Sequence, residues 1–227
     1  MISLVNNYID LLLHPIKSHR DFANQRMEQE RMKKLRNFTL VDQDDPVTEK
    51  KGLVLDFATF AFISWVFVFI FSIYSLSFFH LSEIIKPVIE EEGFLSGLLS
   101  SNDFQKKLFL FSLLFEVVFF PLAAWVYVKF WRVIISFFAS LFDKQVEAEG
   151  LDEVVNTSLV GNFFLVIPIL GKLFKSISQI FYIFLGLKHN LKFTTIQSFI
   201  VVISPLIFVG MFIIFMAMYI MLIVNLY

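Results

Sequence analysis

The sequence of 227 residues contains no cysteine. This absence excludes disulfide bonds, thiolate catalysis and cysteine-ligated metal sites. The four histidines lie in separate segments without the spacing of metal ligands, so no metal site is expected. Signatures of serine hydrolases, P-loop nucleotide-binding proteins and HExxH metalloproteases are missing as well. We therefore expect a protein that is not an enzyme and that needs no cofactor.

Charge is scarce where the sequence is most apolar. The 19 basic and 20 acidic residues give a net charge of -1, which argues against a nucleic-acid partner because phosphates require a basic surface. Residues 193–227 contain no acidic or basic residue and no histidine. A helix needs roughly 20 apolar residues to cross the hydrocarbon layer of a bilayer. This run is therefore expected to hold a membrane span at about residues 204–227.

The rest of the composition predicts several further spans. Hydrophobic residues make up 57% of the chain, and 31 residues are phenylalanine, far more than a soluble domain of this size carries. We predict an all-α, multi-pass membrane protein with a cytosolic, amphipathic and charged segment at residues 1–52 and a membrane domain at residues 53–227. Five spans are expected in that domain, near residues 57–79, 108–128, 154–170, 174–187 and 204–227.

The third and fourth predicted spans are marginal. Residues 154–170 are interrupted by Gly161 and Pro168, and residues 174–187 begin beside Lys172 and Lys175. They become credible as a pair, because a tight turn containing Gly171 would make them a helical hairpin packed against the better spans. The acidic stretch at residues 143–153 is expected to be a loop. Residues 133–142 are too short to cross and are expected to extend the second helix or to lie at the membrane interface.

The N-terminal segment has the pattern of a surface-lying helix. Apolar residues recur at helical spacing up to Ile16, and His14-Pro15 interrupts the helix. The N-terminus lacks the basic start of a signal peptide, so none is expected to be cleaved. Four basic residues further on could attract anionic lipid headgroups, although Glu28 and Glu30 among them fit a simply solvated face equally well. These candidate headgroup contacts are Arg31, Lys33, Lys34 and Arg36.

The distribution of basic residues indicates an orientation. Lys and Arg near the ends of spans are retained on the cytoplasmic side. The N-terminal segment is the heaviest basic block, whereas the later loops differ little. We expect the N-terminus inside and the C-terminus outside, in the cytoplasmic membrane if the protein is bacterial.

One acidic residue stands inside a predicted span. Glu116 lies within residues 108–128, where a charge costs several kcal/mol and marks either a functional site or a polar packing contact. The packing role is favoured, because no second intramembrane charge accompanies it in the sequence. Pro121, Pro168 and Pro205 are expected as helix breaks in three different spans, where freed backbone groups could bind ions or, more often, only kink the helix.

Three segments resemble the Yip (Ypt-interacting protein) family of five-span membrane proteins, in its compact bacterial form. They are Tyr8-Ile-Asp-Leu-Leu-Leu-His-Pro15 with Phe22 seven residues on, Asn162-Phe-Phe-Leu-Val-Ile-Pro168, and residues 179–191 leading into Ile203-Ser-Pro205. The high phenylalanine content and the long charged stretch between Pro15 and Pro46 depart from the family pattern. The resemblance implies a non-enzymatic role, because eukaryotic members act in membrane traffic and bind prenylated small GTPases or related membrane partners.

Two functions follow as expectations. The first is a membrane scaffold or membrane-organising protein that recruits protein partners, shapes lipid or associates with itself. The second is a small channel, transporter or lipid scramblase in which Glu116 and the proline-broken helices line a polar path. No inverted repeat is visible in the sequence to place a substrate site, which lowers the transporter alternative.

Overall fold

The computed structural model describes residues 2–38, 56–89 and 103–226, and these fold as helices without a strand. The all-α prediction is confirmed for this part of the chain. The predicted turn at residues 43–46 lies outside the described residues. The elements are α1 (Ile2–Leu13), α2 (Pro15–Phe38), α3 (Phe57–Ile89), α5 (Asp103–Leu141), α6 (Ala148–Ser158), the 3₁₀ helix η2 (Leu159–Val166), α7 (Gly171–His189) and α8 (Thr195–Leu226).

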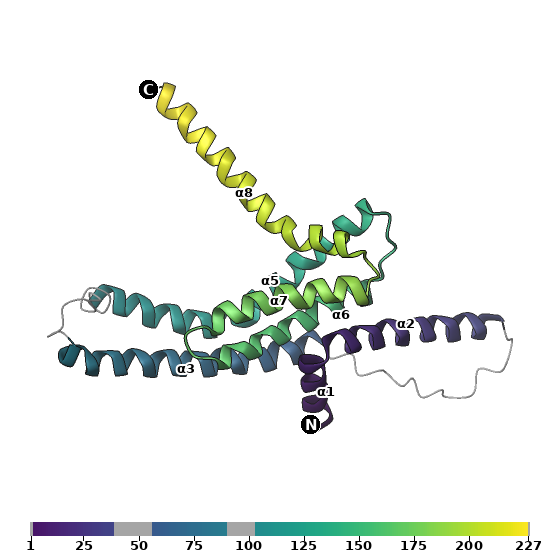
Figure 1. Ribbon diagram of the computed structural model, residues 1–227, viewed down its shortest axis with the longest axis horizontal. Helices are drawn as coiled ribbons and strands as arrows, with labels where there is room; N and C mark the ends of the chain where they lie inside the picture. Colours follow the sequence, from purple (N-terminus) through teal and green to yellow (C-terminus); the bar gives the residue numbers. More distant parts are fainter. Residues whose placement is uncertain (1, 39–55, 90–102, 227) are drawn as a thin grey trace.

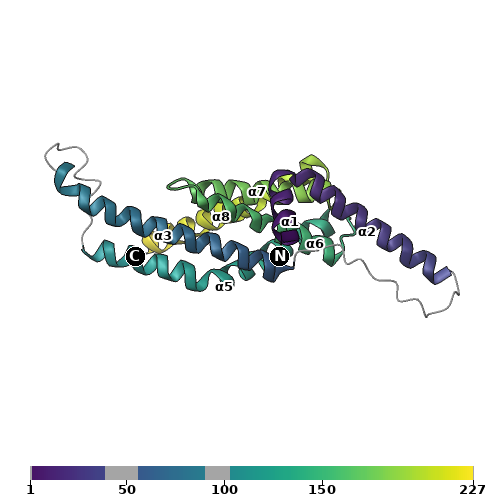
Figure 2. The ribbon, with the colours of Figure 1, turned by 90° about the horizontal axis from the view of Figure 1, so that it is seen from below.

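Five of these elements form an elongated bundle. Helices α3 and α5 lie antiparallel, and α6–η2 and α7 form a second, shorter hairpin beside them (Figures 1 and 2). Helix α1 lies across the bundle, α2 runs on beyond one end of it, and α8 leaves the same end at an angle. One end of the bundle therefore gathers α1, α2, the start of α6 and the end of α7.

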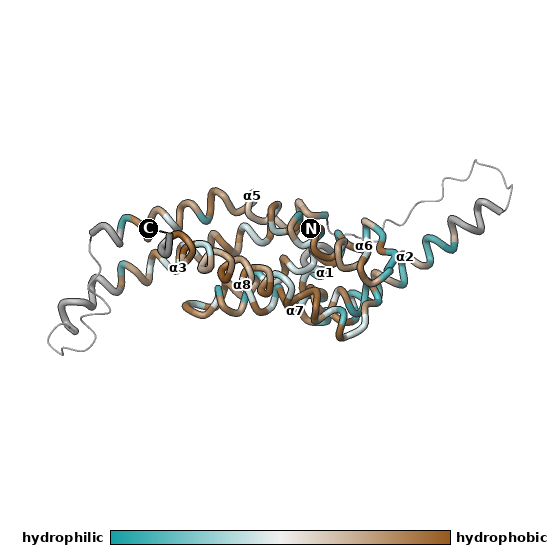
Figure 3. The backbone as a smooth tube through the Cα atoms, turned by 90° about the horizontal axis from the view of Figure 1, so that it is seen from above, coloured by the Kyte–Doolittle hydropathy of each residue, from teal (hydrophilic) through white to brown (hydrophobic). Residues whose placement is uncertain are grey.

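Three helices are long and apolar enough to cross a membrane. Within the described residues these are Phe57–Leu81 in α3, Lys107–Leu141 in α5 and Thr195–Ile223 in α8. In the 18-residue apolar segment of each helix, only 22%, 17% and 11% of the residues are buried inside the protein. Most of their side chains therefore face outward. Figure 3 shows α8 as an almost uninterrupted hydrophobic tube, whereas α2 is largely hydrophilic. Such helices suit a multi-pass membrane protein.

The sequence predicted five spans, two more than the described helices supply by length and apolarity. The difference lies in the shorter hairpin. Residues 154–170 are divided between α6, η2 and a turn, and α7 carries Lys172, Lys175 and Lys188. The expected loop at residues 143–153 is wrong from Ala148 onward, because α6 begins there and buries Leu151 and Glu153.

The central segment of the bundle is α6–η2. Nearly all of its residues from Gly150 to Asn162 are buried, with Val154, Val155 and Val160 fully enclosed. The apolar core continues from it into α3 and α5 through Phe60, Val68 and Ile135. Enclosure by other helices therefore accounts for the apolar side chains of this segment.

The two helices of the shorter hairpin approach closely at glycines. A Cβ added at Gly161 would lie 3.0 Å from the backbone nitrogen of Gln179 and 3.2 Å from the carbonyl oxygen of Lys175. A Cβ at Gly186 would lie 2.6 Å from Cγ1 of Val154. Any larger residue at these positions would force the helices apart.

Local signals set the helix boundaries. Pro15 separates α1 from α2, as the sequence predicted, because proline favours the first position of a helix. A capping box begins α8: the Thr194 amide donates to Oε1 of Gln197 at 2.9 Å, and the Gln197 amide donates to Oγ1 of Thr194 at 3.3 Å. Helix α5 extends to Leu141, which confirms that residues 133–141 lengthen the second predicted helix.

The close approach of η2 and α7 at Gly161 predicts that adding one methyl group there lowers stability. Gly161→Ala should lower the free energy of unfolding by about 1–3 kcal/mol, because α7 backbone atoms cannot move aside alone. Thermal unfolding of the purified protein in detergent measures this. Gly210→Ala is the matched control, because a Cβ there meets no atom within 4 Å. It should leave stability unchanged or raise it by up to about 1 kcal/mol. Equal losses in the two variants would contradict the close crossing.

Candidate functional site

Helix α2 docks on the bundle through one face. His19, Phe22, Ala23 and Arg26 follow the spacing i, i+3, i+4, i+7 and turn toward α6 and α7. His19 and Ala23 are buried, whereas Asn24 and the residues from Met27 to Met32 are exposed. The helix is therefore docked along its first half, and its residues from Met27 to Met32 are exposed.

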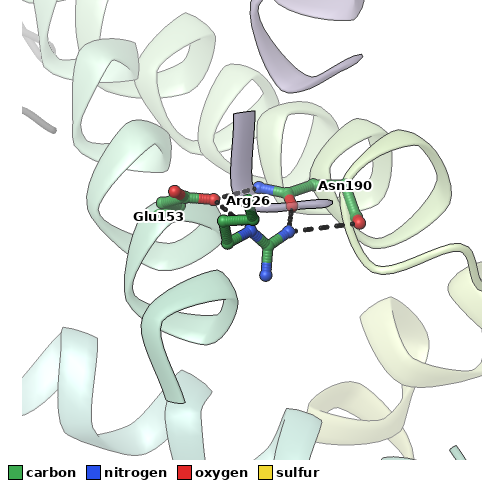
Figure 4. Close-up of polar contacts among 3 residues, drawn as sticks. All are labelled: Arg26, Glu153 and Asn190. Carbon is green, nitrogen blue, oxygen red and sulfur yellow. Dashed lines mark hydrogen bonds and ion pairs between the residues drawn. The ribbon is translucent and has the colours of Figure 1, made fainter. Parts of the chain in front are cut away.

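A buried polar network fastens this face. Nε of Arg26 lies 3.3 Å from Oε2 of Glu153, and the same oxygen accepts a hydrogen bond of 2.9 Å from Nδ2 of Asn190 (Figure 4). The Arg26 guanidinium also donates to Oδ1 of Asn190 and, at 3.4 Å, to its backbone carbonyl. The network joins α2, α6 and the residue that ends α7.

The network is buried, so removing one of its charged partners is expected to cost a large part of the free energy of unfolding. The side chains of Arg26 and Glu153 are only 12% and 4% exposed. Burial raises the pKa of the Glu153 carboxyl, while the Asn190 hydrogen bond and the Arg26 charge oppose the rise. Gly150 makes room for the guanidinium, since a Cβ there would collide with Nη1 of Arg26. A buried ion pair of this kind is costly to break from one side.

His19 lies beside the network without a polar partner. Its ring is fully buried, and neither ring nitrogen has a hydrogen-bond partner among the described residues. Burial, followed by repulsion from His189, lowers the pKa of the imidazole to about 4. His19 is therefore neutral in the folded protein at pH 7.

Glu116 has a partner that the sequence analysis missed. Nζ of Lys172, in the first turn of α7, lies 2.7 Å from Oε2 of Glu116, and Lys175 lies near the same carboxyl. Lys172 also stands over the Phe71 ring at 5.2 Å. The argument that no second charge accompanies Glu116 is thus wrong, because its partner stands 56 residues away in the sequence. The pair ties the start of α7 to the middle of α5.

The other predicted site residues lie apart from one another. Pro121 is inside α5 and Pro205 inside α8, and both helices continue past the proline. Pro168 lies in the turn between η2 and α7. Arg31 is exposed on the projecting part of α2; Lys33, Lys34 and Arg36 follow on the same helix, and their side chains are outside the described set. Of the residues whose side chains the structure describes, the three prolines and Arg31 do not come together in one site.

Sequence reasoning missed the Arg26, Glu153 and Asn190 network. The many charged residues between positions 16 and 36 favour a solvated helix, and Glu153 falls in the loop predicted at residues 143–153. The helical spacing of His19, Phe22, Ala23 and Arg26 was the one available signal. Within the described residues, no group of three or more His, Asp or Glu side chains is placed to hold a metal ion.

Comparisons with known proteins add no name to this geometry. No family model, curated sequence or solved structure matches the chain. The class that the described residues define is an all-α protein with three helices suited to a multi-pass membrane protein. A buried network attaches its N-terminal charged helix to the end of the bundle.

The network predicts an asymmetric mutational effect. Arg26→Met should destabilise the protein by about 3–5 kcal/mol, because it leaves Glu153 buried without its cation. The double variant Arg26→Met with Glu153→Leu should recover most of this loss. Chemical unfolding gives the free energies, and hydrogen exchange of α2 shows whether it has undocked. Arg31→Met, on the exposed part of α2, is the control and should change stability by less than about 0.5 kcal/mol. A double variant no better than the single one would contradict the pairing.

His19 predicts a loss of stability in acid. Its folded pKa is about 4 against an ordinary value of 6.5, so both folded and unfolded chains hold it neutral above pH 7. As the pH falls from 6.5 toward 4, His19 binds a proton in the unfolded chain but stays neutral in the folded chain. Unfolding at pH 5 should therefore need about 2 kcal/mol less than at pH 7 on account of this group.

The variant His19→Phe isolates the contribution of that imidazole. Its unfolding free energy should depend less on pH between 7 and 5 than that of the unmodified protein, by the same amount. His80→Gln is the control, because His80 is exposed on α3 and has no part in this contact; it should leave the dependence on pH as it is in the unmodified protein. An unchanged pH slope in His19→Phe would show that another group causes the acid sensitivity.

Proposed function

We propose that this protein is a non-enzymatic membrane scaffold or membrane-organising protein that holds a charged helix at a fixed position above the bilayer. The observation that carries the proposal is the buried network of Arg26, Glu153 and Asn190. It fixes the start of α2 to the membrane-type bundle, and α2 then continues beyond the bundle with exposed polar residues (Figure 1). A charged helix that is docked through its first half and exposed in its second half is suited to meet partners.

The proposed membrane placement has α3, α5 and α8 as spans and the α6–η2 and α7 hairpin as two further crossings. The hairpin runs alongside α3 and α5, and Tyr74 of α3 donates a hydrogen bond of 2.8 Å to the carbonyl of Val166 near its turn. Five basic residues lie at the end of the bundle where α2 docks: Arg26, Arg132, Lys144, Lys188 and Lys192. The positive-inside rule then places that end in the cytosol and the end of α8 on the other side.

The resemblance to the Yip family is kept within this proposal. Two of the segments that carry it, residues 8–15 and 179–191, include the α1–α2 corner and Asn190. Membership would favour a role in recruiting membrane-associated protein partners.

The alternative is a channel, transporter or scramblase built on Glu116. A carboxylate and two lysines meet beside α5, which is the polar feature such a path would need. The direct contact of 2.7 Å between Glu116 and Lys172 favours a packing role instead, because the carboxylate already has its countercharge within the protein. A scaffold therefore fits this contact better.

Liposome flux separates the two functions. Purified protein should pass no more ions, protons or fluorescent lipid than empty vesicles, and Glu116→Gln should not change this. The variant should instead lower stability by about 1 kcal/mol or less, because the ion pair is partly exposed. Flux that is present in the unmodified protein and lost in Glu116→Gln would overturn the scaffold proposal.

A cross-linking experiment tests the role of α2 directly. A photo-reactive amino acid at Gln29, which is exposed on α2, should give discrete protein adducts in cells, whereas one at Phe212, exposed on α8, should label mainly lipid. Arg26→Met should weaken the Gln29 adducts by undocking α2. Adducts at Gln29 that are unchanged by Arg26→Met would show that the anchoring of α2 does not matter for recruitment.

A further inference from the structure

A cavity opens at the corner between α1 and α2, against the last turns of α7. Its volume is about 560 Å³, within the range of ligand-binding sites. It is distinct from the buried network and from Glu116, and it does not involve the basic residues 31–36. It is lined by the end of α1, the first turns of α2, and Phe181 and Leu185 of α7.

The lining divides into an apolar and a charged part. Leu13, Ile16 and Phe181 are 63%, 42% and 52% exposed, which is high for apolar side chains beside a cavity. Lys17, Arg20, Asp21 and Asn24 follow the spacing i, i+3, i+4, i+7 and form one face of α2, nearly opposite the face that docks. A ligand for this cavity must therefore be amphiphilic.

The charged part offers unused cationic groups. No ion pair joins Lys17 or Arg20 to another residue within the described chain. The Arg20 charge nevertheless reaches His189 across the contact with α7 and, after burial, helps to lower the pKa of that imidazole. Asp21 is the one acidic residue in the lining, so the cations exceed the acids. An anionic group fits between Lys17 and Arg20 better than a cationic one.

The position of the cavity matches the boundary between apolar and polar surroundings. On α7, Phe181 and Leu185 precede Lys188 and His189, which end the helix. On the other wall, Leu13 ends α1, and Lys17 and Arg20 begin the charged part of α2. Helix α1 itself lies against the first turns of the apolar stretch of α3, where the Tyr8 ring is 6.2 Å from that of Phe60. The apolar part of the cavity thus faces the level of acyl chains, and the cations face the level of headgroups.

From this arrangement we infer that the corner cavity binds an anionic phospholipid of the surrounding leaflet. Its phosphate lies between Lys17 and Arg20, and an acyl chain lies along Leu13, Ile16 and Phe181. The bound lipid would hold the α1–α2 corner at a fixed depth, from which the anchored α2 projects. The inference rests on the membrane placement under the proposed function.

Lipid binding to the full-length protein in micelles tests the site. Native mass spectrometry would compare phosphatidylglycerol with phosphatidylcholine of the same chain length, and glycerol 3-phosphate would serve as the soluble source of the same phosphate group. We expect phosphatidylglycerol to bind more tightly than phosphatidylcholine and glycerol 3-phosphate not to compete. The double variant Lys17→Gln with Arg20→Gln should weaken phosphatidylglycerol binding roughly thirty-fold.

Two variants on the same helix sharpen the result. Asp21→Asn removes the acidic residue of the lining and should tighten phosphatidylglycerol binding, opposite in sign to the double variant. Arg31→Gln removes a cation outside the cavity and should have no effect. A loss for Arg31→Gln equal to that for the double variant would overturn the site in favour of diffuse surface attraction. Competition by glycerol 3-phosphate would overturn the lipid as ligand.

Phe181→Ser tests the apolar half independently of charge. It should weaken binding of long-chain phosphatidylglycerol more than that of a short-chain form, whereas equal effects would overturn the acyl-chain contact.

Near-native thermal unfolding of each variant establishes that the corner between α1 and α2 is still folded. Normal lipid binding by the double variant Lys17→Gln with Arg20→Gln would overturn the site. Extraction of the protein from cell membranes by alkaline carbonate tests the membrane placement separately, so failure of the two proposals can be told apart.

Discussion

The packing of the bundle depends on hydrogen bonds that side chains donate to the backbone carbonyl groups of η2. A 3₁₀ helix has poorer hydrogen-bond geometry than an α-helix, and here it lies buried at the centre of the molecule. Side chains from other elements reach its carbonyl groups: Ser64 of α3 donates to Leu159 at 3.1 Å, and Tyr74 donates to Val166 at 2.8 Å. The Tyr8 hydroxyl of α1 approaches the carbonyl of Val160 at 3.4 Å. Two separate helices are thereby positioned on one short segment.

These contacts also determine where α1 and α2 lie at the end of the bundle. Because α1 is held on η2, and the Tyr182 hydroxyl donates to the carbonyl of Leu12 at 2.9 Å, the chain reaches the His14-Pro15 corner at a defined place beside α7. Arg26 can then meet Glu153 and Asn190 three helical turns further on. The same corner leaves a cavity on the opposite side, so the docked face and the charged face of α2 have a common structural origin.

The long helices and the pairing of residues 154–187 as a hairpin were accessible from sequence, whereas the start of α6 and the 3₁₀ helix η2 were not. Helices α3, α5 and α8 were predictable because an apolar run of more than 20 residues is rare outside membrane spans. Residues 154–166 are apolar for a different reason, which is enclosure by other helices, and a single sequence does not separate the two causes. The start of α6 has the composition of a loop, and two of its acidic residues, Asp152 and Glu153, pair with arginines distant in sequence. Asp152, for example, pairs with Arg132 at 2.8 Å.

The same distance in sequence explains what was missed in the candidate sites. Glu116 stood out as an isolated charge, but the lysine that pairs with it begins α7, and only the hairpin turn brings the two together. Arg26 gave no such signal, because charged residues surround it in the sequence and helical spacing alone does not say which of them is buried. The network with Glu153 and Asn190 needs α2, α6 and α7 to be placed first.

The relation between α2 and the far end of α8 does not depend on how the hairpin sits in a bilayer. In Figures 1 and 2 the turn after η2 stops short of the far ends of α3 and α5. Whether or not this turn reaches the second surface, α6 begins and α7 ends at the same end of the bundle, so the hairpin adds two crossings or none. Crossings by α3, α5 and α8 then make the total three or five. Both numbers are odd, so the membrane proposal places the anchored α2 and the end of α8 on opposite sides in either case.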